Sequence, residues 1–524
     1  MRTGKISAAI ILALASSTAY AADQVEYAPP AAYNWTGFHV GVGAGLGGVS
    51  HNAGAEIYNY EPGGLLQIGS ILDFYSIGGL LDFGGDGALG TVEAGFDYQI
   101  GERFVIGIQG DYTWSNFDAG AGVGAAVCID VGCDPEPIIE EYGLDYSLTA
   151  KSSWSILGRA GYVANPGALT YVLGGYTRTK MEGELTLTTP GGSGPLVEYD
   201  YERDGWTIGG GIEAPITGGL TLKMEYRRTE WENDDSFPLF GPVGVNTWDD
   251  AVVQSMRGVL SWRFGGDNAA QQAAVDAIPA VNWTGFNVGV AGGFSTLRHN
   301  AGLDAYSEDG LFGIGDLGIF GLNGDLDFGG EGYLGRLEAG YDFQLGQRVV
   351  LGAFADYTFN NAESQVGLFG DYCVEGFASI DHGIGVDDCD VGYVTASGDL
   401  TYTLETGDSW SIGGRAGFLV NPQTLFYGLG AYTHQNMKAD LTLDTGFDGF
   451  PVGELVSYDY DRDGWTFGLG MQTMLTERLS TKLEYRNTQW DESEIILGDS
   501  DAGVIRTEDS TVQTFTVGLS WKLN

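Results

Sequence analysis

The chain has 524 residues, enough for two or more domains, and its 70 acidic against 24 basic residues give a formal net charge of -46. This balance excludes a protein that binds nucleic acid through its phosphates, because such binding needs a basic surface. After residue 21 no run approaches the ~18 apolar residues that a membrane-spanning helix needs. A membrane protein with this sequence would have to cross the bilayer with strands.

The first 21 residues predict a cleaved secretory signal. They combine a basic start, an apolar stretch over about residues 6–15, and a small-residue site at residues 19–21. We expect cleavage after Ala21 and export from the cytoplasm. The mature chain would then consist of a first repeat, a periplasmic linker and a second repeat, at residues 22–264, 265–280 and 281–524.

The mature sequence contains one pattern twice. NWTGF at residues 34–38 returns at 282–286, and LDFGG at residues 81–85 returns at 326–330. Equivalent residues are 248 apart in the first pair and 245 apart in the second, so insertions and deletions fall between the shared segments. Loops accept such changes more readily than structural elements do. The repeat therefore predicts two copies of one fold.

Alternation with a period of two predicts that the repeated elements are strands. In LTLKMEYR at residues 220–227 apolar side chains alternate with polar ones, whereas a helix would scatter the charges around its circumference. The same test finds eight strands per half. In the first half they lie at about 35–46, 90–100, 104–116, 153–164, 169–186, 205–216, 220–233 and 253–264.

The connections between these strands alternate between short and long. Tight turns are expected at residues 101–102, 165–167 and 217–219, and long excursions at about 47–89, 117–152, 187–204 and 234–252. Short turns on one side and long loops on the other are typical of an outer-membrane barrel. We therefore predict an all-β fold, a transmembrane antiparallel up-and-down barrel.

The apolar phase of each strand is predicted to face lipid, with aromatic rings at the interfaces and no sheet edge left unpaired in hydrocarbon. A water-soluble sandwich would also alternate, but it would give the tryptophans at strand ends no particular purpose. The predicted lipid-facing residues are Phe38, Val40, Val42, Trp154, Ile156, Trp206, Ile208, Ile212, Leu260, Trp262 and Phe264.

The opposite phase predicts a network of paired charges inside the barrel. In the first half it carries Glu93, Asp97, Asp111, Glu213 and Glu225 against Arg159, Lys223, Arg227 and Arg257. In the second half it carries Glu338, Asp342, Asp356 and Glu484 against Arg415, Lys482 and Arg486. An eight-stranded lumen is just wide enough for side chains to fill it, and unpaired charges there would be costly.

This near-neutrality and the polar, Ala-rich linker favour two tandem eight-stranded barrels. Successive strands of one large barrel usually meet at short turns, whereas residues 265–280 form a spacer. The alternative is a single 16-stranded barrel in which the last strand of the first repeat pairs with the first strand of the second.

Several segments resemble the RopB-type, porin-like outer-membrane proteins of alphaproteobacteria. They are NWTGFHVGVGAGLG at 34–47, GRAGYVANP at 158–166, GWTIGGG at 205–211 and VLSWRF at 259–264, and the resemblance covers nearly the whole chain, twice. Members of that family have one eight-stranded barrel of about half this length. The resemblance implies outer-membrane location and assembly, by the barrel assembly machinery, through a terminal aromatic signal. We assign that signal to Trp262, Phe264 and Trp521, although the second copy ends in SWKLN where the family has a terminal Phe.

The four cysteines predict one disulfide in each half. Cys128 and Cys133 lie five residues apart, while Cys373 and Cys389 flank a loop-like stretch of the other half. No histidine or third cysteine stands at metal-ligand spacing, so in an oxidising compartment disulfides are expected instead of a metal site.

No catalytic, cofactor or metal site is expected. His51 and His299 occupy the same repeat position, but no Ser or Asp partner accompanies both copies, so we expect them to anchor loops by hydrogen bonds. His39 is expected to make a polar contact in the lumen. Acidic loops are expected to bind divalent cations at most loosely, between the protein and lipopolysaccharide.

The sequence therefore predicts a non-catalytic integral protein of a Gram-negative outer membrane that displays long, acidic, disulfide-closed loops. Its expected partners are outer-membrane lipid, lipopolysaccharide and the barrel assembly machinery. The alternative function is a porin-type diffusion channel for small solutes or ions, in which the inward charges line water and set selectivity.

Overall fold

The computed structural model describes residues 33–59, 66–68, 72–74, 76–129, 140–231, 234–240, 243–307, 312–314, 317–375, 393–444, 453–490, 493–498 and 502–523. Nearly all of these residues belong to antiparallel strands. The helix α1 (Asn268–Asp276) lies between the two halves of the chain. Within the described ranges, helices long and apolar enough to cross a membrane are absent, a finding that leaves the strands out of account.

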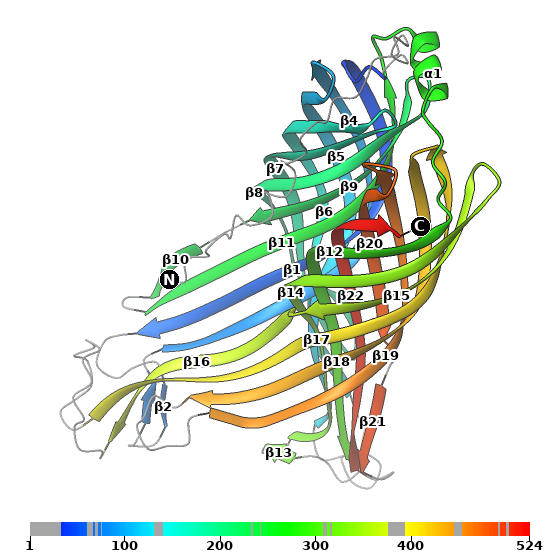
Figure 1. The fold of residues 1–524 in the computed structure, drawn as a ribbon. Coiled ribbons are helices and arrows are strands. Elements are labelled where there is room, and N and C mark those ends of the chain that lie inside the picture. Colours follow the sequence, from blue (N-terminus) through cyan, green and yellow to red (C-terminus); the bar gives the residue numbers. More distant parts are fainter. Residues whose placement is uncertain are drawn as a thin grey trace.

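The first half closes into a barrel of eight antiparallel strands (Figure 1). Each of these strands pairs with the next, and the last returns to the first from His39↔Arg263 to Asn59↔Val243. The strands are β1 (Gly37–Asn59), β4 (Ser76–Ile100), β5 (Phe104–Ile129), β6 (Glu140–Asn165), β7 (Ala168–Thr189), β8 (Gly192–Thr217), β9 (Leu220–Trp231) and β11 (Val243–Arg263).

The second half repeats this arrangement, and β22 returns to β12 from Asn287↔Lys522 to Ser307↔Ala502. Its strands are β12 (Gly285–Ser307), β14 (Leu317–Leu345), β15 (Val349–Asn360) with its continuation β16 (Glu363–Glu375), β17 (Tyr393–Asn421), β18 (Thr424–Asp444), β19 (Gly453–Met474), β20 (Leu479–Trp490) and β22 (Ala502–Lys522). Five short strands lie at the loop end: β2 (Leu66–Ile68), β3 (Leu72–Phe74), β10 (Asp234–Phe240), β13 (Phe312–Ile314) and β21 (Ser493–Gly498). The predicted all-β, up-and-down fold is confirmed.

We call the end of the molecule opposite the short turns the loop end. At the loop end the strands are much longer than the sequence predicted. Much of what we expected to be loop is strand: β1 continues to Asn59, β5 to Ile129, and β8 begins at Gly192. These extensions are rich in glycine and charge, so their alternation of apolar and polar residues is weak. Pairing with neighbouring strands, which no local pattern reveals, keeps them extended.

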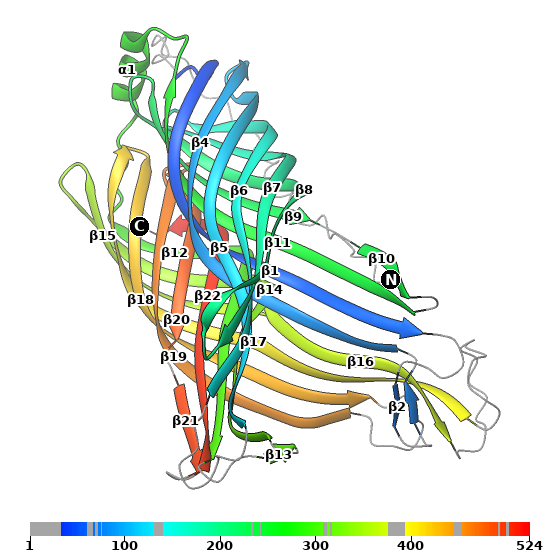
Figure 2. The same cartoon turned by 180° about the vertical axis from the view of Figure 1, so that it is seen from behind.

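At the loop end the two halves exchange strands. β4 pairs with β5 only as far as Asp86↔Asp118; beyond that point β4 pairs with β16 through Leu81↔Val366, and β5 pairs with β14 through Ala121↔Leu326. Followed through these exchanged pairs, the strands form one ring of 16. The turn end therefore holds the two predicted barrels. The ring differs from the alternative weighed from the sequence, because it closes through β4–β16 and β5–β14 and not through β11 and β12. At the loop end the described strands diverge into two arms, because β8 and β19 extend beyond their pairing with β9 and β20 (Figures 1 and 2).

The repeated segment LDFGG lies at the crossing point of this exchange. Phe83 of β4 pairs with Phe328 of β14, the equivalent residue of the other half. Gly84 and Gly329 follow them, and a Cβ atom on Gly84 would overlap the Cα atom of Gly329. Glycine is therefore required where the two backbones approach each other, and this explains why the segment occurs twice.

The repeated NWTGF segment joins the start of the first strand to the end of the neighbouring strand at the turn end of each barrel. Asn34 Oδ1 accepts a hydrogen bond from the Thr36 amide at 2.9 Å, and the Trp35 amide donates to Gln99 Oε1 at 3.0 Å. Gly37 follows with φ of 147°, a conformation that side chains with a Cβ rarely adopt. The second copy repeats these bonds with Asn282 and Gln344.

The two barrels pack against each other through outward-facing apolar side chains. Ile212 is only 4% exposed, because the second barrel covers it. Its side chain faces outward as predicted, but the prediction that it contacts lipid is wrong, since it contacts the other barrel. The buried cluster joins Ile212, Ala214, Met224 and Met256 to Met471, Leu483, Tyr485 and Phe515. Ile212 and Met471 are equivalent residues, as are Met224 and Leu483, so the contact is pseudo-symmetric.

Candidate functional site: the two lumens

The first lumen contains a continuous network of buried ion pairs. Arg159 reaches Asp97 at 3.4 Å and Glu213 at 2.5 Å, while Lys223 pairs with Glu93 across the barrel. These side chains come from β4, β6, β8 and β9 and converge because each lies on the inward phase of its strand. The further pairs are Arg227 with Asp111 at 2.7 Å, Arg227 with Glu225 at 2.6 Å, and Arg257 with Asp111 at 3.7 Å.

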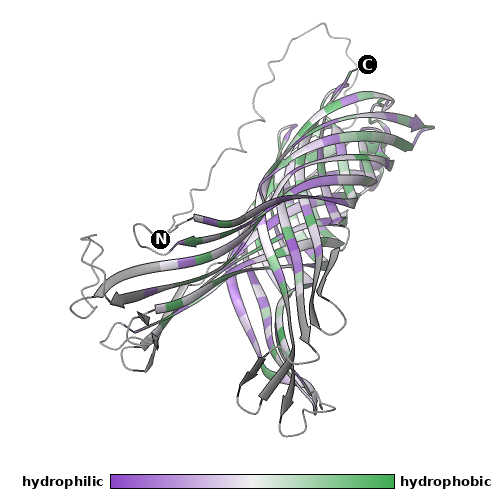
Figure 3. Ribbon diagram, turned by 90° about the horizontal axis from the view of Figure 1, so that it is seen from below, coloured by the Kyte–Doolittle hydropathy of each residue, from purple (hydrophilic) through white to green (hydrophobic). Residues whose placement is uncertain are grey.

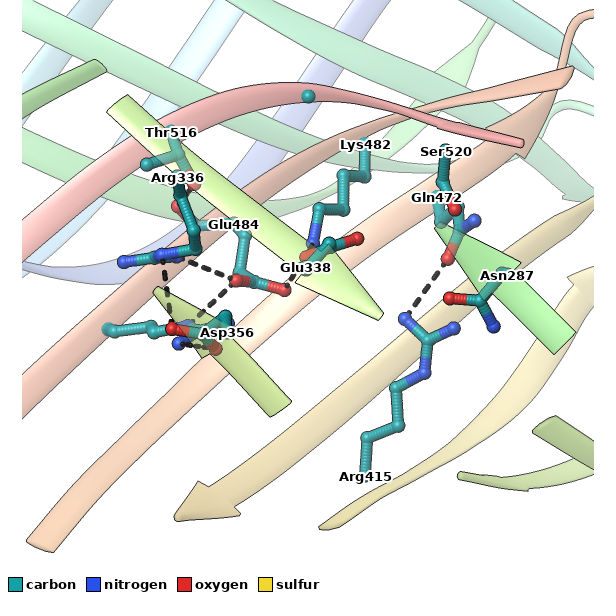
Figure 4. Close-up of polar contacts among 12 residues, drawn as sticks. Asn287, Arg336, Glu338, Asp356, Arg415, Gln472, Lys482, Glu484, Thr516 and Ser520 are labelled. Carbon is teal, nitrogen blue, oxygen red and sulfur yellow. Dashed lines mark hydrogen bonds and ion pairs between the residues drawn. The ribbon is translucent and has the colours of Figure 1, made fainter. Parts of the chain in front are cut away.

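The second lumen repeats the network with its own residues (Figure 4). Lys482 pairs with Glu338, and Glu484 lies at its centre. The other pairs are Arg486 with Asp356 at 2.7 Å, Arg486 with Glu484 at 2.8 Å, Lys482 with Glu484 at 3.4 Å, and Arg415 with Asp342 at 2.5 Å. All 16 side chains assigned to the lumens from the sequence therefore point inward and lie within these two networks.

Two further cations belong to these networks and were not predicted from the sequence. Arg263 contacts Asp97 at 2.9 Å and Glu213 at 3.1 Å, and Arg336 contacts Glu484 at 3.2 Å. The signal that could have found them is strand phase: Arg263 lies two residues from the inward Ser261, and Arg336 lies two residues from Glu338. With them, five cations face five carboxylates in the first lumen, and four face four in the second.

Apolar clusters lie on both sides of each ionic layer. In the first barrel Trp35, Leu157 and Val275 of α1 belong to the cluster at the turn end, and Phe117, Met181 and Trp231 to the one at the loop end. The second barrel has corresponding clusters around Trp283 and Leu425, and around Met437 and Trp490. Each lumen is thus apolar, ionic and apolar again along its length.

Hydrophobic and hydrophilic residues alternate along the strands (Figure 3), and many large hydrophobic side chains of both barrels are exposed on their outward faces. Phe38 is 66% exposed and Val42 62%, values that a water-soluble core would not show. The other residues predicted to face lipid are also exposed, apart from Ile212: Val40, Trp154, Ile156, Trp206, Ile208, Leu260, Trp262 and Phe264.

A family model of the outer membrane protein beta-barrel domain matches residues 8–264 and again residues 268–522. The chain belongs to this family. It is a member that carries the barrel domain twice, and both the resemblance to alphaproteobacterial outer-membrane proteins and the location in the outer membrane are confirmed.

Curated relatives of this outer-membrane barrel come from alphaproteobacteria. The 31 kDa outer-membrane immunogenic protein of Brucella melitensis is 27% identical over 231 residues, which are 42% of this chain and 85% of the relative. The 25 kDa outer-membrane immunogenic protein of Brucella abortus is 24% identical over 50% of this chain and 100% of its own. The 22 kDa outer membrane protein of Rhizobium leguminosarum is 26% identical over 29% and 59%.

Solved structures with a similar fold include a FadL homologue of Pseudomonas aeruginosa, 13% identical, which covers 93% of this chain and 91% of its own with a TM-score of 0.23. Ail, the attachment invasion locus protein of Yersinia pestis, is 16% identical and covers 46% of this chain and 99% of its own with a TM-score of 0.21.

The predicted disulfides remain predictions. Cys128 lies in β5 and Cys373 in β16, whereas Cys133 and Cys389 lie outside the described residues. The described part of the chain contains no cluster of three or more His, Cys, Asp or Glu side chains that could hold a metal ion. The terminal aromatics Trp262, Phe264 and Trp521 are exposed on the last strands, and their role in assembly stays a prediction.

His51 and His299 lie within strands β1 and β12, not in loops as expected. Both are buried, and His299 Nδ1 lies 2.5 Å from Ser510 Oγ. The equivalent of Ser510 in the first half is Ala251, so the pair occurs in one half alone. His299 and Ser510 are each 1% exposed, so the pair is buried within the second barrel.

Proposed function

We propose that this outer-membrane barrel is a non-catalytic anchor that holds strand-built surface extensions outside the membrane and conducts no solutes. The supporting observation is the filling of both lumens. Lys223 and Lys482 are 0% and 2% exposed at their side chains, and each is paired with a carboxylate from across its barrel. A channel that passes solutes needs water along its axis, and here ion pairs and apolar clusters occupy that axis.

The strand extensions are the second support. Beyond the residues that contact lipid, β7 and β8 continue as a hairpin whose outward side chains are charged. Arg178 pairs with Glu202 at 2.6 Å and Lys180 with Asp200 at 2.8 Å. A charged and regularly hydrogen-bonded extension is suited to an aqueous surface outside the cell, where the high net negative charge also disfavours association between copies.

Planar-bilayer recording tests the proposal. The purified full chain, shown to be folded by heat-modifiable migration on gels, should give little conductance or only small, unsteady events. Large, stable steps at the same protein density would replace the anchor with the diffusion channel.

A matched variant distinguishes a closed lumen from a failed insertion. Trp35→Ala combined with Trp231→Ala shortens the apolar cluster at each end of the first lumen, and it should raise the conductance above that of the unmodified chain. In a diffusion channel those clusters would not limit the flow, so the two proteins would conduct alike.

A further inference from the structure

The lipid-facing wall of the second barrel contains a groove of about 780 Å³ on β15, β17, β18, β19 and β20. These five strands are consecutive neighbours in the wall (Figure 2). A volume of this size lies within the ~300–1,000 Å³ of pockets that bind small molecules. The groove continues to Leu46 of the first barrel and so ends at the contact between the two barrels.

Two rows of directly paired residues build the groove. One row is Leu351, Ala416, Gly428, Leu469 and Tyr485; the other continues Gly414, Gly430, Phe467 and Asn487. The floor therefore consists of three glycines and one alanine on β17 and β18. Leu351 forms one wall, and Phe467 and Leu469 form the other, with exposed fractions of 43%, 58% and 45%.

The fold does not require glycine on this floor. A Cβ atom on Gly428 would have Gly468 O as its nearest heavy atom at 3.8 Å, and on Gly430 the nearest would be 4.0 Å away. Neither residue has a positive φ. Glycine inside a strand is destabilising, so its presence at sites with room for a side chain needs another explanation.

The equivalent wall of the first barrel shows what fills this space. Val172 takes the place of Gly428, and 60% of its surface is exposed to the membrane. Of the four floor positions this one alone differs between the barrels, and its directly paired neighbour differs as well: Gly210 in the first barrel stands where the second has Leu469.

We propose that this groove holds one acyl chain of a phospholipid from the inner leaflet of the outer membrane. The lining is mostly apolar, with Asn487 on β20 at one edge, and lies on the lipid-facing wall, and this fits an acyl chain. The floor and wall of the groove lie close to the short turns, since Leu351 follows the turn at Gly346 and Gly428 follows the start of β18 at Thr424. Short turns lie on the periplasmic side of such barrels, whose leaflet is phospholipid. Leu46 of the first barrel closes one end of the groove. The acyl chain is therefore held in place there.

Native mass spectrometry of the full chain, released from outer-membrane extracts in mild detergent, tests this proposal. The unmodified protein should retain one phospholipid, and Gly428→Val, which reproduces the first barrel, should lower the retained fraction at least about fivefold. Val172→Gly is the matched control: it makes an equal and opposite change of volume away from the groove and should leave retention of the first lipid unchanged.

A second measurement guards against loss of folding. Gly430→Ala adds a single methyl group to the floor and should lower retention by about twofold in a protein with unchanged heat-modifiable migration. Equal retention in the unmodified chain and Gly428→Val would overturn the proposal, as would no retained lipid in any variant. Retention of lipid A in place of phospholipid would overturn the assignment to the inner leaflet.

Discussion

The two lumens share most of their charges but take one of them from different strands. In the first, Arg257 of β11 lies 3.7 Å from Asp111 and donates to Thr113 at 3.4 Å. In the second, the equivalent of Arg257 is Thr516, and Arg336 of β14 occupies the same site instead, 3.8 Å from Asp356 and 2.9 Å from Thr358. The equivalent of Arg336 in the first half is Thr91.

A second difference removes a pair completely. Glu213 and Arg263 contact each other at 3.1 Å in the first lumen, while Gln472 and Lys522 stand at the equivalent positions. Lys522 donates instead to the carbonyl of Asn282, and Gln472 accepts from Arg415. The carboxylate is thus lost from the second lumen, and the cation at the equivalent position lies outside the network. The difference teaches that the balance of charge inside each barrel is maintained, while the residue that supplies each charge is free to change.

The largest expected effect comes from breaking the pair that both lumens share. Lys223→Met leaves Glu93 buried without its cation and should lower the free energy of unfolding by ~3–5 kcal/mol. Lys482→Met should have an equal effect through Glu338. Urea unfolding in lipid vesicles measures both. The double variant Glu93→Leu with Lys223→Met removes both charges and should recover most of the loss; if it does not, packing and not charge is responsible.

The arginine that β11 supplies in the first lumen and β14 supplies in the second gives the sharpest test of whether the two sites are equivalent. Arg336→Thr should destabilise the second barrel by ~2–4 kcal/mol, because Asp356 and Glu484 lose a buried cation. Adding Thr516→Arg recreates the first barrel's arrangement and should recover at least half of that loss. Unfolding free energies of the two single variants and the double variant provide the measurement. No recovery in the double variant would show that the two sites are not interchangeable.

A smaller effect is expected at the contact between the barrels. Arg228 makes a two-pronged contact with Glu331, at 2.6 and 2.9 Å, and the equivalent of Arg228 in the second half is Asn487. A double-mutant cycle of Arg228→Ala and Glu331→Ala should give a coupling energy of ~1–2 kcal/mol, because the pair is charge-assisted and partly buried. Additive single effects would mean that the pair does not join the barrels.

The smallest effect concerns pH at the strand exchange. Trp114 pairs with Gly90 of β4, and Asp82 lies eight residues further toward the loop end, outside the membrane. Burial raises the pKa of Asp82 to about 6, although hydrogen bonds from Gln365 and Asn52 act in the opposite direction. A raised pKa means that the folded form holds the proton more tightly. The exchange should therefore be most stable below pH 4 and should weaken as the pH rises to 6, by ~1 kcal/mol after screening.

Hydrogen exchange of the backbone amides of residues 78–87 at pH 5 and 7.5 measures this dependence. Asp82→Asn should remove it. Asp327→Asn serves as the control, since Asp327 is the equivalent residue but already pairs with Arg298 at 3.1 Å. Equal protection at both pH values in the unmodified protein would contradict the prediction.

The sequence predicted the parts of this molecule that depend on local alternation. The inward phase of Glu93, Lys223 and their equivalents follows from a period of two, and the same rule applied to Arg263 and Arg336 would have completed both networks. The number of strands per half followed from the same period. These features are decided within one strand.

The parts that the sequence did not predict depend on partners far away in the chain. Ile212 has the phase of a lipid-facing residue, and only the position of the second barrel buries it. Pairing of β5 with β14 joins Ala121 to Leu326, and no alternation distinguishes that partner from β4. Equivalent strands of a repeat are nearly interchangeable partners, so sequence alone leaves the choice between two barrels and one ring open.

The strand exchange makes the peptide connection between the halves dispensable. β4 is bonded to β16, and β5 to β14, so separating the halves would require breaking backbone ladders as well as residues 265–280. A protease that cuts only at α1 should leave one undivided particle, and two fragments expressed from separate genes could assemble into the same object. The two copies of the repeat are therefore joined by backbone hydrogen bonds as well as by the peptide chain.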